Sequence, residues 1–451
     1  MEPIVTPLQM GAIDAAAPTP TSELIERAGA AVAAAAIREL GGRYGRRVVV
    51  IAGPGNNGAD GRAAARRLTR AGMRVELIAP GDVPARPERA DLIVDAAFGT
   101  GFRGTYEAPD VGSTPVLAVD IPSGVDGLTG LASGRPLAAV RTVTFAAHKP
   151  GLLLGDGPGL VGTVEVADIG LDVGDPGSWL VVDADVRAHW PVRPRESHKW
   201  HAATWVVAGS PGMSGAADLA TRGALRSGAS YVRLSTPGTV NPGGVHPEVV
   251  AIGLPLVGWD RAVLDGSDRV ASLVVGPGLG REDATREAVV ALARRAGRPL
   301  VLDGDALWAL ASHDEPLPGD RPTVLTPHDG EYTQLTGHTP GADRFEAARR
   351  LAAARNAVVL LKGPTTIIAE PSGRTAAVIS GSPRLASAGT GDVLSGIIGA
   401  LLARGLDPFR AAALGAHVHG RAAAQWLHHD GLLAGDLADL VPAAVDAILE
   451  P

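Results

Sequence analysis

Short apolar runs alternate along the chain with longer stretches in which apolar and polar residues recur at helical spacing. Continuous apolar runs predict strands that are buried on both faces, as in a parallel sheet, and the stretches between them predict helices. In the first half we expect a helix from about Ser22, a turn at 53–58 and a second helix at 59–71. The strands predicted there are 48–52, 75–79, 92–95, 116–120, 142–146 and 163–166.

The alternation restarts after a Pro-rich, charged segment at 190–197, which we interpret as a linker. Short strands joined by helices are typical of doubly wound α/β folds. We therefore expect two α/β/α domains, at 1–190 and 191–451. The strands predicted in the second half are 205–208, 231–234, 273–275, 300–303, 323–325 and 358–361.

Composition narrows the class of protein. At 451 residues the chain exceeds an ordinary single domain, and 45% hydrophobic residues suffice for two cores. The net charge of -7 argues against nucleic acid as the main partner. The absence of cysteine excludes disulfides and thiolate metal sites, which suits a reducing compartment. We expect neither a signal peptide nor a membrane-spanning segment, and hence a cytoplasmic protein.

The segment Ala388-Gly389-Thr390-Gly391-Asp392 precedes an apolar helix. Glycines at a helix N-terminus let backbone N–H groups approach a phosphate closely, and the helix end favours negative charge. An aspartate there repels phosphate unless it has a task, such as taking the proton of a hydroxyl that attacks a phosphoryl group. The segment therefore indicates phosphoryl transfer to an alcohol, with Asp392 as the base. A plain helix cap after a flexible turn is the alternative.

In the first half, polar residues follow three predicted strands. The glycine-rich turn that contains Asn57 joins a strand to a helix, and Asp95 and Asp120 end the next two strands. Because the carboxyl ends of parallel strands meet at one sheet edge, these side chains should lie together. Each could alone be a strand-end cap, but three at one edge favour a ligand site.

GNNGADG, DAAFGTGFRG, DIPSGVDGLTG and TVTFAAHKPGLL, in this order, resemble the NAD(P)H-hydrate epimerase domain over about residues 1–190. The resemblance implies a Rossmann-like domain with a potassium ion held by Asn57, Asp95 and Ser123. It also makes Asp120 our candidate for the general acid or base of epimerisation. By motif, the implied substrate contacts are Asn56, Asn57, Gly58, Ala59, Asp60, Gly99, Thr100, Gly101, Phe102, Arg103, Gly104, Thr105 and Asp120.

In the second half, VGPGLG, TPHDGE, LKGPTT and AGTGDVLSG together resemble the nucleotide-dependent NAD(P)H-hydrate dehydratases of the ribokinase-like superfamily, over about residues 195–451. One departure is HKWHAATWVVAGS, which has Ala and Thr where a glycine-bearing turn is more usual; if that turn contacts the nucleotide, affinity changes. The implied hydrate contacts are Ala216, Gly278, His328 and Asp392. The implied contacts to the adenine nucleotide are Lys362, Gly363, Pro364, Thr365, Thr366 and Gly391.

Together the two resemblances imply repair of hydrated NADH and NADPH (NADHX and NADPHX). The first domain would interconvert the R and S hydrates. In the second, Asp392 would deprotonate the ring hydroxyl as it attacks the terminal phosphoryl of ADP or ATP, with Mg²⁺, before phosphate leaves. The expected assembly is a homo-oligomer. A small-molecule kinase with a non-catalytic nucleotide-binding first domain is the alternative, and the choice between ADP and ATP stays open, with a lean to ADP.

Overall fold

The computed structural model describes residues 1–82, 84, 90–240 and 246–450. The chain folds into two compact units, Glu2–Trp179 and Leu180–Pro451, and the second also includes Met1. Each unit is an α/β fold on a mainly parallel sheet, which confirms the predicted fold class. The boundary lies before the predicted linker at 190–197, because the apolar side chains of Val181 and Val186 are already buried in the second core.

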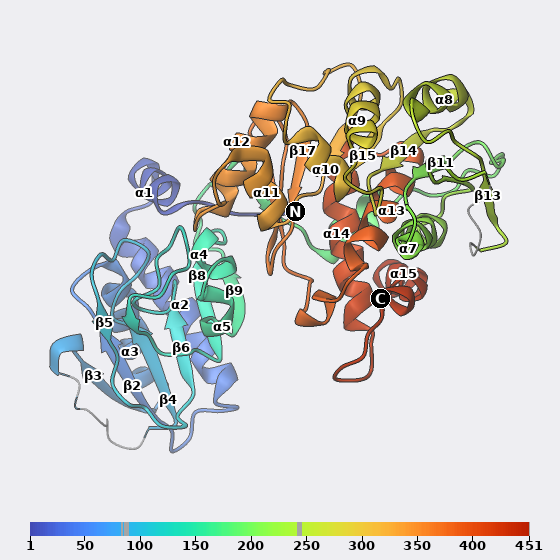
Figure 1. The fold of residues 1–451 in the computed structure, drawn as a ribbon. Helices are drawn as coiled ribbons and strands as arrows, with labels where there is room; N and C mark the ends of the chain where they lie inside the picture. Colours follow the sequence, from blue (N-terminus) through green and yellow to red (C-terminus); the bar gives the residue numbers. More distant parts are fainter. Residues whose placement is uncertain (83, 85–89, 241–245, 451) are drawn as a thin grey trace. The chain divides into compact units, whose positions relative to one another are not determined.

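The sheet of the first unit has six parallel strands in the order β3-β2-β4-β6-β8-β9 (Figure 1). The chain crosses from β2 to β3 on one side and then returns to place β4 on the other side of β2. Ligands in such sheets bind beyond the carboxyl ends of the strands at this reversal. The strands are β2 (Arg47–Ala52), β3 (Arg74–Ile78), β4 (Leu92–Ala96), β6 (Val116–Val119), β8 (Arg141–Phe145) and β9 (Thr163–Ala167).

Alternate side chains of β2 enter different cores. Val48 and Val50 pack with α2 (Thr21–Glu39) and α3 (Asn56–Arg70), and Val49 packs on the opposite face against the segment that follows β4. The two helices approach closely, since a side chain at a central glycine of α2 would collide with α3. The remaining elements are β1 (Glu2–Pro3), α1 (Pro7–Ala16), η1 (Pro80–Asp82), β5 (Tyr106–Glu107), β7 (Gly134–Arg135), α4 (Pro150–Leu153) and α5 (Gly157–Leu160).

The sheet of the second unit runs β19-β18-β17-β16-β15-β14-β11-β12-β13. Its strands are parallel from β17 to β13. Strand β18 pairs antiparallel with both β17 and β19, an arrangement that the sequence interpretation missed. The chain order reverses between β11 and β14. The strands are β11 (Ala203–Val207), β12 (Tyr231–Ser235), β13 (Val249–Ala251), β14 (Ser272–Val275), β15 (Leu300–Leu302), β16 (Thr323–Leu325), β17 (Val358–Leu361), β18 (Thr366–Ala369) and β19 (Thr375–Val378), after β10 (Ser178–Leu180).

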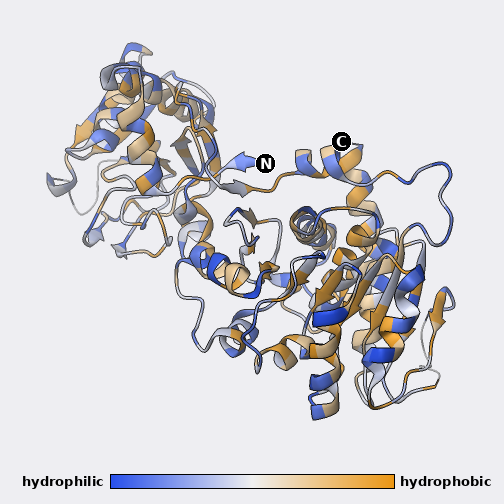
Figure 2. Cartoon of the chain, turned by 90° about the horizontal axis from the view of Figure 1, so that it is seen from above, coloured by the Kyte–Doolittle hydropathy of each residue, from blue (hydrophilic) through white to orange (hydrophobic). Residues whose placement is uncertain are grey.

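Helices cover both faces of this sheet (Figure 1). One face packs on α7 (Ser214–Arg226), α13 (Thr390–Ala403), α14 (Pro408–Ala424) and α15 (Ala434–Leu449) in a single buried cluster. Figure 2 shows apolar residues concentrated in the strands and polar ones on outer helix faces. In the described ranges no helix is both long and apolar enough to cross a bilayer. The other elements are α6 (Asp183–His189), α8 (Trp259–Gly266), η2 (Ser267–Arg269), α9 (Asp283–Arg295), α10 (Asp305–Leu310), α11 (Asp329–Thr336), α12 (Arg344–Arg355) and η3 (Pro383–Leu385).

Candidate active sites

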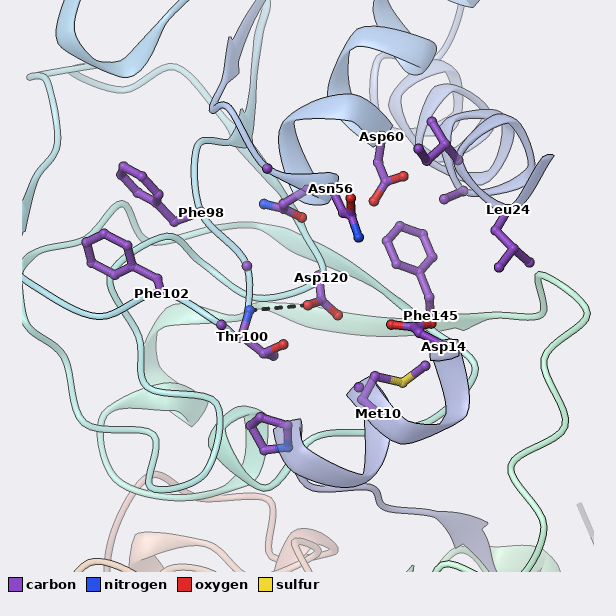
Figure 3. A pocket seen from close by; sticks show the side chains of 18 of the residues that line it. Met10, Asp14, Leu24, Asn56, Asp60, Phe98, Thr100, Phe102, Asp120 and Phe145 are labelled. Atoms are coloured by element: carbon purple, nitrogen blue, oxygen red, sulfur yellow. Dashed lines mark hydrogen bonds between the residues drawn. The ribbon is translucent and has the colours of Figure 1, made fainter. Parts of the chain in front are cut away.

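A cavity of about 580 Å³ opens at the carboxyl ends of the strands of the first unit (Figure 3). Its walls come from α1, the N-termini of α2 and α3, the loop after β4 and the ends of β6 and β8. Of the predicted substrate contacts, eight line it: Asn56, Asn57, Asp60, Gly99, Thr100, Gly101, Phe102 and Asp120. The predicted contacts outside this lining are Gly58, Ala59, Arg103, Gly104 and Thr105.

Asp120 lies at the floor of this cavity, one residue beyond β6. Its backbone has φ +66°, a left-handed conformation that few residues other than glycine adopt. Its Oδ1 lies 2.9 Å from Lys149 Nζ and accepts a hydrogen bond from Thr144 Oγ1 at 3.1 Å. Burial raises the pKa of the Asp120 carboxyl, but the Lys149 ammonium and the hydrogen bonds outweigh burial and hold it below its ordinary value. Asp120 is therefore an ionised carboxylate in the cavity.

Two more carboxyl groups face the same cavity (Figure 3). Burial, and then the charges of Asp120 and Asp14, raise the pKa of Asp60 to about 8. Burial also raises the pKa of Asp14, which lies on α1. An ionised Asp120 beside a protonated Asp60 separates the roles of proton acceptor and proton donor within one cavity.

Of the residues predicted to hold potassium, Asn57 lines this cavity, and Asp95 and Ser123 lie outside its lining. Asp95 is fully buried, and its Oδ1 accepts from Ser123 Oγ at 2.6 Å while its Oδ2 accepts from Ser123 N–H at 2.9 Å. Among the residues that the structure describes, no lysine or arginine forms an ion pair with Asp95. Within the described part of the chain, the buried amide of Asn57 finds no hydrogen-bond partner for either Oδ1 or Nδ2. A buried carboxylate without a cation and an unpartnered amide oxygen fit a bound alkali cation.

The second unit has a corresponding pair at its sheet edge. Asp303 directly follows β15, and its Oδ1 lies 3.0 Å from Lys362 Nζ, directly after β17. Thr326 Oγ1 donates to Asp303 Oδ1 at 2.7 Å, and Ser395 Oγ donates to Oδ2 at 2.6 Å. Burial raises the pKa of the Asp303 carboxyl, but the Lys362 charge and the hydrogen bonds outweigh burial. The pKa of Asp303 therefore lies below its ordinary value. Lys362 Nζ also lies 3.5 Å from Glu331 Oε2.

Asp392 is the third residue of α13, which begins after Gly389 in a left-handed conformation of φ +91°. The first-turn N–H groups of a helix have no partner within the helix and are available to an anion. A side-chain carbon at Gly391 would lie 3.6 Å from Lys362 Nζ. Burial, and then the charge of Asp303, raise the pKa of Asp392 to about 7. Asp392 can therefore exchange a proton near neutral pH, beside a lysine.

The other predicted residues of the second unit take varied positions. A side chain at Gly278 would meet Ala216 Cβ at 3.0 Å, so these two lie together. His328 caps α11, and its Nδ1 accepts from the N–H groups of Gly330 and Glu331. The loop from Gly363 to Thr365 joins β17 to β18, and Thr366 is the first residue of β18.

The segment HKWHAAT, which departs from the dehydratase pattern, leads into the N-terminal end of β11, where Ala203 lies opposite Tyr231. In a parallel sheet this end lies away from the carboxyl edge, where Asp303 and Lys362 follow their strands. The substitution of glycine there therefore does not place bulk beside the Asp303–Lys362 pair.

Sequence reasoning did not assign four charged residues that lie at these sites: Asp14, Lys149, Asp303 and Glu331. Asp303 had the same signal as Asp95 and Asp120, a carboxylate at the end of an apolar run. Lys149 lies within a quoted motif, and α1 had the signal of a capping box between Thr6 and Gln9 with Pro at the first helical position.

The chain matches two protein-family models and several curated proteins. Residues 204–443 match a family model described as NAD(P)H-hydrate dehydratase, and residues 21–87 and 81–151 match one described as the N-terminus of YjeF-related proteins. A Salinibacter ruber protein named bifunctional NAD(P)H-hydrate repair enzyme Nnr is 36% identical, with 94% of this chain and 92% of that protein aligned. A Mycobacterium leprae protein of the same name is 38% identical, over 90% and 89% of the two chains.

Solved structures align with about 60% of this chain. A Bacillus subtilis ADP/ATP-dependent NAD(P)H-hydrate dehydratase, co-crystallised with ATP and Mg²⁺, gives a TM-score of 0.54 at 32% identity over 60% of this chain and 98% of that one. A ribokinase-like superfamily protein from Enterococcus faecalis gives the same TM-score at 21% identity, which supports the fold alone.

Proposed function

Because the chain belongs to the bifunctional NAD(P)H-hydrate repair enzymes, with an N-terminal epimerase and a C-terminal ADP/ATP-dependent dehydratase, we propose which residues perform each reaction. The cavity around Asp120 interconverts the two hydrate epimers. The sheet edge around Asp303, Lys362 and Asp392 dehydrates the S hydrate. The observation that carries the second assignment is Asp392 in the first turn of α13, with Gly391 beside the Lys362 ammonium.

In the dehydration, Asp392 takes the proton of the ring hydroxyl while that oxygen attacks the terminal phosphoryl of ADP or ATP. The bond from phosphorus to the departing nucleotide breaks as the new P–O bond forms. The new phosphate group then leaves with the C–O electron pair, and a proton is lost from the neighbouring ring carbon. These losses restore the ring double bond and give NADH or NADPH with inorganic phosphate.

The residues around Asp392 supply charge and orientation. The N–H groups of the first turn of α13 and the Lys362 ammonium stabilise the negative oxygens of the transferred phosphoryl. Asp303 holds Lys362 in place through their ion pair. Mg²⁺ bound with the nucleotide would supply further positive charge to the phosphate groups. By motif, the remaining nucleotide contacts are Gly363, Pro364, Thr365 and Thr366, and the hydrate contacts are Ala216, Gly278 and His328.

One assay tests this assignment against the alternative of a small-molecule kinase. The enzyme is incubated with hydrated NADH, Mg²⁺ and either ADP or ATP, and both the absorbance of the reduced ring and free phosphate are followed. We expect one phosphate per restored ring. A stable phosphorylated product without restored absorbance would support the kinase, which the matched families and relatives do not favour.

In the epimerisation, protonated Asp60 donates its proton to the ring hydroxyl, which leaves as water from the carbon next to the ring nitrogen. The nitrogen lone pair stabilises the cation that remains. Water then adds from the opposite face, and ionised Asp120 takes its proton. The pairing of Asp60 and Asp120 in one cavity supports these roles, because their environments hold their pKa values apart.

A potassium ion held by Asn57, Asp95 and Ser123 would supply a fixed positive charge beside this cavity. The unpartnered amide of Asn57 and the buried carboxylate of Asp95 support it. If the site is real, KCl at constant ionic strength raises the unfolding temperature of the first unit more than NaCl does, and Asn57→Leu removes the difference. Equal responses to both salts in the parent enzyme would reject it. The homo-oligomer and the cytoplasmic location remain predictions of the sequence.

A further inference from the structure

Helix α14 carries two buried histidines that bond in different directions. His417 Nε2 lies 2.7 Å from Asp183 Oδ1, on the short helix α6. His419 Nε2 lies 2.9 Å from the backbone carbonyl oxygen of Thr390, the first residue of α13. Two residues along a helix turn the side chain to nearly the opposite side. Only His419 therefore reaches the segment that carries Asp392.

The segment that leads into the first turn of α13 has few side chains that can fix it. It contains two alanines and two glycines among residues 386–391, and Gly389 has a left-handed backbone. Thr390 is its main anchor, since Thr390 Oγ1 lies within hydrogen-bonding distance of both Leu385 O at 2.8 Å and Ser387 O at 3.0 Å. The bond from His419 to the carbonyl of the same residue adds a fixed point from a different helix. A backbone with two glycines needs such support if it is to hold the base, Asp392, in a fixed position.

The imidazole of His419 is suited to a constant role. A carbonyl oxygen can only accept, so Nε2 carries the hydrogen and the ring donates. Burial, and then the positive charge of Lys362, lower the pKa of His419 to about 4, with the bond to Thr390 opposing them. The ring is thus neutral and keeps this donor throughout the working pH range.

We propose that His419 is a positioning residue for the dehydration, because its hydrogen bond to the Thr390 carbonyl fixes the first turn of α13 and with it the carboxylate of Asp392. It acts through Thr390 and touches no reacting atom. This inference rests on the proposed role of Asp392 as the base. The geometry assigns no such part to His417, which ties α14 to α6.

The test compares variants at position 419 in the full-length enzyme, with kcat, the KM for the S hydrate and thermal unfolding measured for each. His419→Leu removes the donor at similar volume. His419→Gln keeps an N–H at about the distance of Nε2, and His419→Asn carries the same amide one carbon shorter. We expect His419→Leu and His419→Asn to lower kcat about tenfold or more with KM little changed. The kcat of His419→Gln should remain within about threefold of the parent enzyme.

His417→Leu is the matched control, since it removes an equally buried imidazole from the same helix. It should lower the unfolding temperature and leave kcat per folded enzyme within about threefold of the parent. If His419→Leu unfolds the protein, the difference in kcat between His419→Gln and His419→Asn still tests the positioning role. Equal rates for Gln and Asn, or an equal loss of kcat from His417→Leu, would overturn the proposal.

Asp392→Asn, measured alongside, separates this inference from the function on which it rests. If Asp392→Asn keeps substantial dehydratase activity, the proposed base is wrong and the positioning role falls with it. If Asp392→Asn is inactive while the variants at 419 match the parent enzyme, the base stands and only the positioning role of His419 is rejected.

Discussion

The two units each hold an Asp–Lys pair at the carboxyl edge of the sheet, but the two lysines differ in access. Lys149 is 1% exposed, and its Nζ bonds Asp120, Thr144 Oγ1 and the Phe145 carbonyl oxygen. Lys362 is 22% exposed and pairs with Asp303 and Glu331. The three oxygens around Lys149 engage all three donors of its ammonium, whereas the partly exposed ammonium of Lys362 can also meet a phosphate. The difference matches the two proposed reactions, of which only dehydration uses a phosphoryl donor.

The choice of lysine is itself informative. Only three of the 41 Lys and Arg residues are lysines, and two of them are Lys149 and Lys362. An ammonium is a compact charge with three donors, whereas a guanidinium is a broad planar fork. In the first unit the compact group fits beneath Asp120. The third lysine, Lys199, is exposed and provides a natural control.

Each unit also holds a carboxyl group whose pKa is raised to between about 7 and about 8. In the first unit it is Asp60, at about 8, and in the second it is Asp392, at about 7. The proposed roles are opposite, since Asp60 must donate a proton and Asp392 must accept one. The same physical device, burial near other carboxylates, thus serves an acid in one site and a base in the other.

The largest expected effects come from replacing the two lysines. Lys362→Met should lower dehydratase kcat/KM about 100-fold to 1,000-fold, because a donor to the transferred phosphoryl is lost, and leave epimerisation intact.

Lys149→Met should abolish epimerisation and destabilise the first unit by about 3–5 kcal/mol, because Asp120 is left buried without its partner.

Two rate assays, with urea unfolding monitored by hydrogen exchange in each unit, measure these effects. Lys199→Met serves as the control and should change none of them. If Lys149→Met unfolded no more easily than Lys362→Met, the contrast between a sealed pair and an open one would be lost.

The dehydratase and epimerase activities should respond to rising pH in opposite directions. Dehydratase kcat/KM should rise with pH up to about 7 and then level, because Asp392 must be ionised among Asp303, Glu331, Asp305 and Lys362. Epimerase kcat/KM should fall above about pH 8, where Asp60 loses its proton. The measurement is initial rate against pH for each reaction on one preparation. Parallel profiles would contradict the assignment of opposite roles.

A further effect should appear in the pH dependence of stability. The pKa of Asp60 is raised from 3.8 to about 8, so the folded protein keeps a proton that the unfolded chain releases. The parent enzyme should therefore lose stability relative to Asp60→Asn as the pH rises from about 4 to about 8, with a constant difference above that. Urea unfolding of the first unit across this range measures it. A difference that did not change with pH would place Asp60 in a more solvated position.

The sequence predicted much of both sheets and part of both sites. Apolar runs located the strands closely, and the ends of parallel strands placed Asp95 and Asp120 at one edge. It did not predict Asp14, because which helix closes a cavity depends on tertiary packing and not on local pattern. Lys149 was missed for a related reason, since it lies beyond the end of β8 and reaches back to a neighbouring strand.

The helix that contains Asn57 begins at Asn56, within the residues predicted as a turn. Asparagine and glycine are poor helix formers, so local propensity favoured the turn. The structure nevertheless brings Asn57 beside the loop after β4, since a side-chain carbon at Gly99 would lie 3.3 Å from both Asn57 Cβ and Asp120 Oδ2.

The central claim is that Asp120 and Asp392 serve separate reactions in one chain. It is tested most directly by giving Asp120→Asn and Asp392→Asn a mixture of both hydrate epimers with ADP or ATP and Mg²⁺, and resolving the epimers by chromatography over time. Asp120→Asn should consume the S hydrate and leave the R hydrate at its enzyme-free rate. Asp392→Asn should restore no NADH and still equilibrate the epimers. Restored NADH with Asp392→Asn, or rapid loss of the R hydrate with Asp120→Asn, would contradict the account.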